Sequence, residues 1–161
     1  MEQFEDIYKK YYEKVYLFLL RCTANPSLTE ELTQETLYKA FLHIHQYEGR
    51  SSIYTWLCKI AKNTWITERG RQKRMVQLQE DWEAESGENL EETILKRQLL
   101  ELMRRELWHL PEPYLSVCTL RIYAELPYAE IASEYGKSES WAKVTFYRGK
   151  VMLMERMEKY Q

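Results

Sequence analysis

The apolar residues of this chain recur every three or four positions, which is the spacing of an α-helix with one buried face. The pattern runs from Phe4 to Leu20, and residues 53–61 repeat it at i, i+3, i+4 and i+7. No segment alternates convincingly between apolar and polar residues, and 5 Gly and 4 Pro supply little turn chemistry for a many-stranded sheet. The sequence therefore predicts an all-α fold.

Small polar residues, glycines and prolines divide this pattern into successive helices. Asn25-Pro26-Ser27 ends the first helix, and Ser27 stands three residues before Glu30, the spacing of a capping box that begins a second. The expected buried stripe of this second helix is Leu32, Leu37, Phe41 and Ile44. A loop at 49–52 precedes a third helix. Helices are also expected from 94 to the prolines at 111 and 113, at 114–123, and on either side of 135–137.

The net charge of −2 hides an uneven distribution. Residues 49–78 carry 7 basic side chains against one acid, whereas residues 79–95 carry 7 acids and no base. The basic block suits nucleic acid, because lysine and arginine displace counterions from phosphates, but a solvated helix face has the same composition. The acidic block lacks apolar periodicity and is typical of a linker. We therefore expect two small helical domains, 1–75 and 95–161, joined by an acidic flexible linker at 76–94.

Several classes of protein do not fit the sequence. No run approaches the roughly 20 apolar residues of a membrane helix, and the acidic start differs from a secretory signal, so we expect a cytoplasmic protein without membrane insertion. Cys22, Cys58 and Cys118 are odd in number and lack CxxC spacing, which predicts buried thiols rather than disulfides or zinc ligands. His43 and His45 cannot share a helix face. We expect no metal and no cofactor.

The second half contains the pattern of a helix-turn-helix. Gly136 stands where a tight turn between two helices needs positive φ, Ala132 is small where the helices would cross, and Ser138 can cap the second helix. The inner face of that helix would hold Ala142, Phe146 and Leu153. Its outward residues would be Ser140, Lys143, Val144, Tyr147 and Arg148. Such residues read base edges in the major groove, although an ordinary helical hairpin would show the same spacing.

Three motifs follow one another along the chain. The first is ELTQETLYKAF at 31–41, and the second is QYEGRSSIYTWL at 46–57 with IAKNT at 60–64. The third comprises LPEPY at 110–114, LPYAEIA at 126–132, Gly136, WAK at 141–143 and YRGK at 147–150. In this order they closely resemble the extracytoplasmic-function (ECF) sigma factors, the small two-domain promoter-recognition subunits of bacterial RNA polymerase. The resemblance covers nearly the whole chain except the acidic block.

The resemblance implies roles for the first two motifs. In the family, the helix of the first motif presents polar residues to the clamp helices of the largest polymerase subunit. The matching residues are Glu31, Gln34, Glu35 and Lys39, which a solvated helix face would also explain. The loop of the second motif captures a base flipped from the non-template strand of the −10 element. The residues assigned to −10 DNA are Tyr47, Gly49, Arg50, Ser51, Ser52, Lys59, Lys62 and Asn63, whereas Trp56 is expected in the core.

In the family the third motif forms the helix-turn-helix that binds the −35 element. Lys143, Val144, Tyr147 and Arg148 match its DNA-contact positions, in agreement with the outward set above. The sequence also departs from the family pattern. Pro127 replaces a capping Ser or Thr, Leu115 a frequent arginine, Cys58 a frequent aromatic, and Val144 and Thr145 polar or basic residues. The last two replacements weaken the expectation of the usual −35 consensus.

The resemblance thus implies a specificity subunit rather than an enzyme. It would direct polymerase to a set of promoters, help open the −10 region, carry its acidic linker near the RNA exit path and be held from polymerase by an anti-sigma factor. One alternative is a stand-alone helix-turn-helix regulator that dimerises through its N-terminal half and binds palindromic DNA. The other is a metal-dependent nucleic-acid enzyme that uses Glu30, Glu31 and Glu35, although no nucleophile or phosphate-binding loop accompanies these residues.

Overall fold

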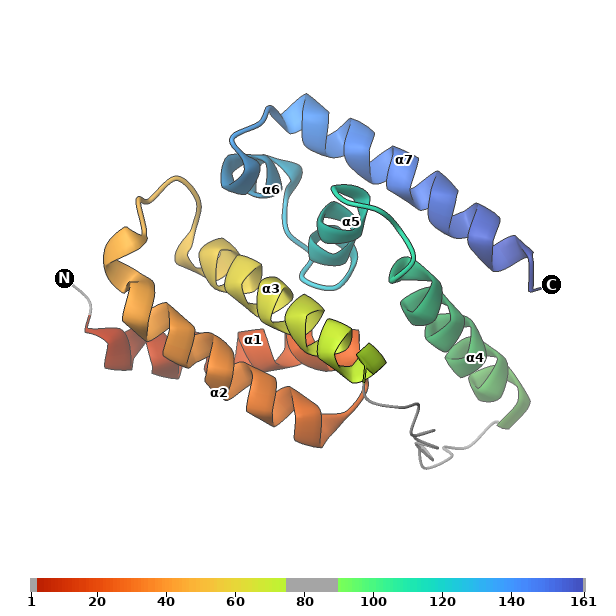
Figure 1. Ribbon diagram of the computed structural model, residues 1–161, viewed down its shortest axis with the longest axis horizontal. Coiled ribbons are helices and arrows are strands. Elements are labelled where there is room, and N and C mark those ends of the chain that lie inside the picture. Colours follow the sequence, from red (N-terminus) through yellow and green to blue (C-terminus); the bar gives the residue numbers. More distant parts are fainter. Residues whose placement is uncertain (1–2, 75–89, 161) are drawn as a thin grey trace.

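The computed structural model describes residues 3–74 and 90–160, and within these ranges the regular elements are helices (Figure 1). The N-terminal half comprises α1 (Phe4–Thr23), α2 (Pro26–His43), a short 3-10 helix η1 (Ile44–Gln46) and α3 (Ile53–Arg74). The C-terminal half comprises α4 (Leu90–Leu107), α5 (Tyr114–Ile122), α6 (Tyr128–Tyr135) and α7 (Glu139–Glu158). The predicted all-α fold is confirmed.

The junction of α1 and α2 is capped by Asn25 rather than by Ser27. The Asn25 side chain accepts a hydrogen bond from the backbone N of Leu28 at 3.1 Å, and Pro26 occupies the first turn of the helix. Proline suits that position because its fixed φ is helical and its missing N–H would have had no partner. The capping box predicted at Ser27 is therefore wrong, and the cap of α2 lies two residues earlier, at Asn25.

The buried stripe of α2 also differs from the prediction. Leu32 and Leu37 are buried as expected, but Phe41 is 55% exposed. Its ring makes an edge-to-face contact with the ring of Phe4. The remaining buried positions of α2 are filled by three threonines and one alanine: Thr29, Thr33, Thr36 and Ala40. The Thr33 hydroxyl donates to the Thr29 carbonyl at 2.7 Å, so this buried polar group is satisfied within its own helix.

The helix-turn-helix in the second half has the predicted local geometry. Gly136 has φ 62° and ends α6. Its backbone N–H and that of Lys137 donate hydrogen bonds to carbonyls in the last turn of the helix. Ser138 caps α7 by accepting from the backbone N of Trp141 at 3.1 Å. Ala132 is buried where the helices cross. These features place α6 and α7 as the sequence predicted, because each depends on neighbouring residues.

The inner face of α7 differs from the one that the periodicity predicted. Ala142 and Leu153 are buried as expected, but Phe146 is only half-buried, and Thr145 and Gly149 complete the face. A Cβ at position 149 would lie 2.5 Å from the Cys118 sulfur, so only glycine lets α7 approach α5 this closely. Thr145 therefore serves packing and does not face outward with Val144.

Helix α4 begins within the segment that the sequence assigned to the linker. Residues 90–94 form its first helical turn, and the rest of the predicted linker, 76–89, lies outside the described residues. The apolar residues of its first half are exposed rather than buried: Ile94, Leu95, Leu99 and Leu100. Its second half is anchored by the buried Glu106, which accepts from Arg156 of α7 at 2.9 Å.

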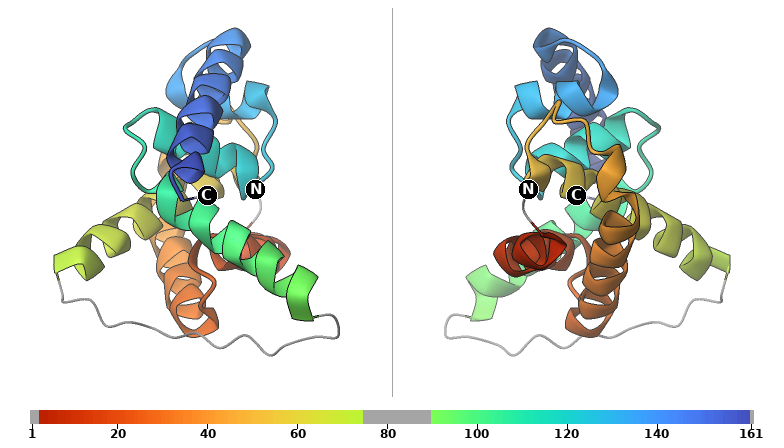
Figure 2. Two further views of the ribbon diagram at one scale, coloured as in Figure 1. Left: turned by 90° about the vertical axis from the view of Figure 1, so that its right-hand side faces the viewer. Right: turned by 90° about the vertical axis from the view of Figure 1, so that its left-hand side faces the viewer.

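The two halves contact each other along α3, which lies against α5 and α6 (Figures 1 and 2). The rings of Trp65 on α3 and Trp108 after α4 meet edge-on at 5.2 Å, and the Arg69 guanidinium covers Trp108 at 4.9 Å. Arg21 at the end of α1 donates to the Tyr123 carbonyl at 3.0 Å. Figure 2 shows the end of α3 and the start of α4 diverging to opposite sides. The division into two domains stays a prediction.

Candidate nucleic-acid interface

The loop before α3 is a compact turn held by a hydrogen bond and a ring contact of Tyr47. The Tyr47 hydroxyl donates to the Ser51 carbonyl, and the Tyr47 ring packs on Trp56 with 5.5 Å between ring centroids. Gly49 has φ 75°, which is the left-handed conformation that glycine reaches without steric cost. The Arg50 guanidinium pairs with Glu48 at 2.8 Å, and both side chains are exposed. Burial raises the pKa of Tyr47, as do the nearby carboxylates of Glu130 and Glu134.

Ser52 precedes α3 and caps it, because its hydroxyl accepts from the backbone N of Thr55 at 3.1 Å. The loop and α3 together carry the residues predicted to bind −10 DNA. Gly49, Arg50, Ser52 and Asn63 are exposed, Tyr47 and Lys59 are half-buried, and Ser51 and Lys62 are buried. The structure thus brings the predicted set together on one side of the N-terminal half, but it covers part of that set with the C-terminal half.

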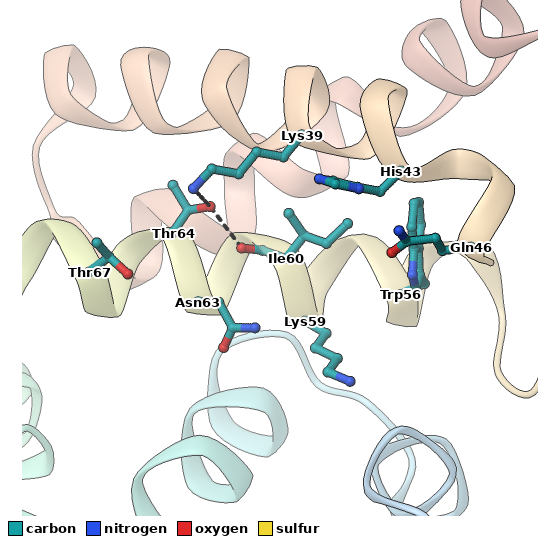
Figure 3. Close-up of a pocket in the computed structure, with 9 residues that line it drawn as sticks. All are labelled: Lys39, His43, Gln46, Trp56, Lys59, Ile60, Asn63, Thr64 and Thr67. Atoms are coloured by element: carbon teal, nitrogen blue, oxygen red, sulfur yellow. Dashed lines mark hydrogen bonds between the residues drawn. The ribbon is translucent and has the colours of Figure 1, made fainter.

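A pocket of about 280 Å³ opens between α2 and α3 (Figure 3). Its lining residues are Lys39, His43, Gln46, Trp56, Lys59, Ile60, Asn63, Thr64 and Thr67. The lining combines two cations, an imidazole, two amides and an indole face. Such groups pair with phosphates, hydrogen-bond to base edges and stack on base rings. The lining therefore has the chemical groups that a nucleotide-binding surface uses.

One prediction changes at this pocket, because Trp56 was expected in the core but is half-buried and lines the pocket. Lys39, which was predicted to bind polymerase, pairs with Glu35 and also donates to the Thr64 hydroxyl at 3.2 Å (Figure 3). Its contact with polymerase stays a prediction. Sequence reasoning missed His43 and Gln46 as pocket residues. His43 follows Lys39 at i+4, so helical spacing from that lysine could have found it.

The remaining residues predicted to bind polymerase form an exposed polar surface on α2. Glu31, Gln34 and Glu35 all face solvent, and Glu35 pairs with Lys39 at 3.2 Å. The ring of Tyr38, 62% exposed, adjoins them. This surface is accessible to a large partner, since its three residues are exposed and the C-terminal half packs mainly on α3.

The outward residues of α7 are exposed as the periodicity predicted: Ser140, Lys143, Val144, Tyr147 and Arg148. Lys143 pairs with Glu139 one turn earlier at 3.7 Å. Val151 and Met154 extend the same face and are also exposed. The face therefore offers cations and apolar groups on the first turns of a capped helix, which is the arrangement that enters a major groove.

Other side chains of the described ranges show no reactive arrangement. Over residues 3–74 and 90–160, no cluster of three or more histidine, cysteine or acidic side chains is placed to hold a metal ion. The three cysteines are free and buried, as predicted, and burial raises the pKa of Cys58 and of Cys118 to about 12. None of the helices described is both long and apolar enough to span a bilayer.

Comparison with known proteins assigns the family. Residues 7–75 match the family described as Sigma-70 region 2. The RNA polymerase sigma factor YlaC of Bacillus subtilis (strain 168) is 31% identical, and the match covers 98% of this chain and 94% of that protein. The ECF RNA polymerase sigma factor SigM of the same organism is 30% identical, with 92% and 91% covered. The chain belongs to the ECF sigma factors.

Two solved structures have the fold of this sigma factor. The sigma factor RpoE of Bartonella quintana, solved with the anti-sigma factor NepR, has a TM-score of 0.59 and 20% identity, with 96% of each chain covered. CnrH, solved with the cytosolic domain of CnrY, has a TM-score of 0.63 and 14% identity, with 98% of this chain and 89% of CnrH covered.

Membership of the family decides between the alternatives raised by the sequence. Sigma factors are promoter-recognition subunits of bacterial RNA polymerase, and as a class they are non-enzymatic. This sigma factor therefore has core polymerase and promoter DNA as its partners. A stand-alone regulator or a metal-dependent nuclease has no support from the relatives.

Proposed function

We propose that this sigma factor holds the melted non-template strand of the −10 element on the loop at 47–52 and in the pocket between α2 and α3. The observation that carries the proposal is the lining of that pocket. The indole of Trp56 offers a stacking surface, while Lys39 and Lys59 supply positive charge for phosphates and His43 and Asn63 supply polar groups for a base edge. A flipped base loses stacking worth a few kcal/mol, and contacts of this kind compensate for that loss.

The duplex −35 element binds to the exposed face of α7 in this proposal. Lys143 and Arg148 face the phosphates or guanine edges, and Val144 and Tyr147 make apolar contacts with the groove floor. The exposed valine at 144 offers no hydrogen bond to a base, so thymine methyl groups are its favourable neighbours.

The polar surface of α2 contacts core polymerase through Glu31, Gln34 and Glu35. The test is co-migration of the purified protein with bacterial core polymerase on size exclusion. The double substitution Gln34→Ala/Glu35→Lys should abolish co-migration, because it removes an amide and reverses a charge on an exposed face. Retained binding by this variant would place the polymerase contact elsewhere.

Regulation by an anti-sigma factor in the cytoplasm is part of the proposal. It is supported by the two related folds, both of which were solved with a partner chain, one named as an anti-sigma factor. We further propose that residues 1–75 act as the polymerase- and −10-binding domain and residues 95–161 as the −35-binding domain, with α4 reaching back into the linker to residue 90.

The −10 assignment can be tested with the reconstituted holoenzyme and a library of random promoter sequences. His43→Ala should relax base preference within the −10 element and leave −35 preference unchanged, since His43 lines the pocket. His45→Ala is the matched control, because His45 is exposed two residues away and does not line the pocket. Equal −10 preferences for both variants and the unmodified protein would contradict the assignment of the pocket.

A further inference from the structure

Two carboxylates of α6 lie on the loop and helix proposed to bind the −10 strand. The backbone N of Ser52 donates to Glu130 Oε2 at 3.0 Å, and the Ser51 hydroxyl donates to Glu134. The Lys59 amino group lies 3.5 Å from Glu134 Oε2. Only 9% of the Glu134 side chain is exposed, so this carboxylate is held inside the contact and is not a solvated surface charge.

The same contact buries a second cation of the proposed DNA site. Lys62, 4% exposed, donates to the Ser116 hydroxyl at 3.1 Å and to the Tyr135 hydroxyl at 3.0 Å. Ser116 in turn donates to Glu112 Oε1 at 2.8 Å, which connects the lysine to a third carboxylate. Lys62 cannot reach a phosphate while α5 and α6 occupy these positions.

The groups that contact these carboxylates are those that bind a nucleic-acid backbone. A backbone N–H at the start of a helix, a serine hydroxyl and a lysine ammonium all donate to phosphate oxygens as readily as to carboxylates. The Ser52 N–H lies at the N-terminus of α3, where the helix dipole favours an anion. Glu130 and Glu134 therefore occupy positions suited to two phosphates of a bound strand.

The contact covers one of the three proposed interfaces and leaves the other two exposed. The polar surface of α2 and the outward face of α7 remain exposed while α6 covers the loop. The contact therefore directly covers only residues proposed to bind the melted −10 strand and leaves the other two proposed interfaces uncovered.

We propose that α6 is an intramolecular competitor for the −10 strand, with Glu130 and Glu134 standing in for phosphates of the DNA in the free protein. This inference rests on the proposed −10 function of the loop. The strand binds only after α6 separates from α3, so its apparent affinity is reduced by the fraction of molecules that are open. Binding of the strand and separation of the two halves are then a single coupled event.

The test compares two full-length variants that lose the same charge from the C-terminal half. Glu130→Ala/Glu134→Ala removes the contact, and Glu155→Ala/Glu158→Ala removes two exposed carboxylates at the far end of α7. Each is measured for binding to a single-stranded −10 oligonucleotide selected with the holoenzyme, and for the distance between dyes at Ser27→Cys and Lys150→Cys. The native cysteines are buried and should not react with the dye.

We expect the first variant to bind the strand roughly tenfold more tightly and to show a longer dye separation, with less than a twofold gain for the control. An equal gain in both variants would assign the effect to net charge and overturn the proposal. A longer separation without a gain in affinity would show that α6 does not compete, and an unchanged separation would show that the carboxylates do not hold the halves together. A separate measurement tests whether the loop binds the −10 strand at all. If it does not, Arg50→Ala added to the Glu130→Ala/Glu134→Ala variant would leave strand binding unchanged.

Discussion

Replacing Gly149 with alanine should destabilise the protein, although alanine is the better helix former. The added Cβ would lie 2.5 Å from the Cys118 sulfur and 3.3 Å from the Tyr114 Cβ, so α5 and α7 would have to move apart. Overpacking of this kind costs about 1–3 kcal/mol, and the gain in helix propensity offsets about 1 kcal/mol of it. We expect a net loss of up to about 2 kcal/mol in the free energy of unfolding.

A double-mutant cycle isolates the steric cause. In a Cys118→Ala background the nearest clash is absent, so Gly149→Ala should be neutral or stabilising, with a coupling energy of about 1–3 kcal/mol. Gly70→Ala is the control, because Gly70 is exposed within α3 and no atom lies within 4 Å of its added Cβ. Urea unfolding followed by circular dichroism gives each value. If Gly149→Ala stabilised the unmodified protein as Gly70→Ala should, the close approach of α5 and α7 would be wrong.

Three further predictions concern single side chains. Arg148→Ala should weaken the free energy of promoter binding by about 1–3 kcal/mol and relax sequence specificity at one −35 position. A uniform loss of binding across all sequences would indicate a phosphate contact instead. Asn63→Ala should impair promoter opening, measured by permanganate reactivity, more than polymerase binding; equal losses would contradict its place in the −10 pocket. Burial raises the pKa of Glu106, but hydrogen bonds from Tyr160 and Arg156 outweigh this and leave it lowered. The ionised Glu106 therefore stabilises the folded state fully above the unfolded pKa of about 4.3, and this stabilisation is lost as pH falls through the lower folded pKa. Glu106→Gln should abolish this part of the loss of thermal stability in acid.

The elements that could be predicted from the sequence are those set by neighbouring residues. The turn at Gly136 and the cap at Ser138 each involve residues within a few positions, so their chemistry is readable along the chain. Helical periodicity also identified the outward face of α7. It identifies which residues share a face but not what covers that face. Phe41 was for this reason placed in a buried stripe, although it is exposed.

The candidate site was predictable in its composition and not in its surroundings. The basic block at 49–78 indicated affinity for anions, and the family resemblance assigned that affinity to DNA. Neither could show that Glu134, 75 residues beyond Lys59, supplies the anion in the free protein. Such a contact depends on how two helical groups meet, and no local pattern encodes that arrangement. The pocket between α2 and α3 was missed for a similar reason, since its walls come from two helices.

Lys59 belongs both to the proposed −10 site and to the contact with α6. This leads to a prediction that loss of positive charge alone would not make. Lys59→Ala takes a cation from the proposed −10 site and also takes a partner from Glu134, so one effect weakens strand binding while the other favours the open form. The net loss of affinity should therefore be smaller in the otherwise unmodified protein than in the Glu130→Ala/Glu134→Ala background, where only the DNA contact remains to be lost. Strand binding measured in both backgrounds at one salt concentration decides the matter. Equal losses would mean that Lys59 serves the DNA alone and that its contact with α6 has no part in the competition.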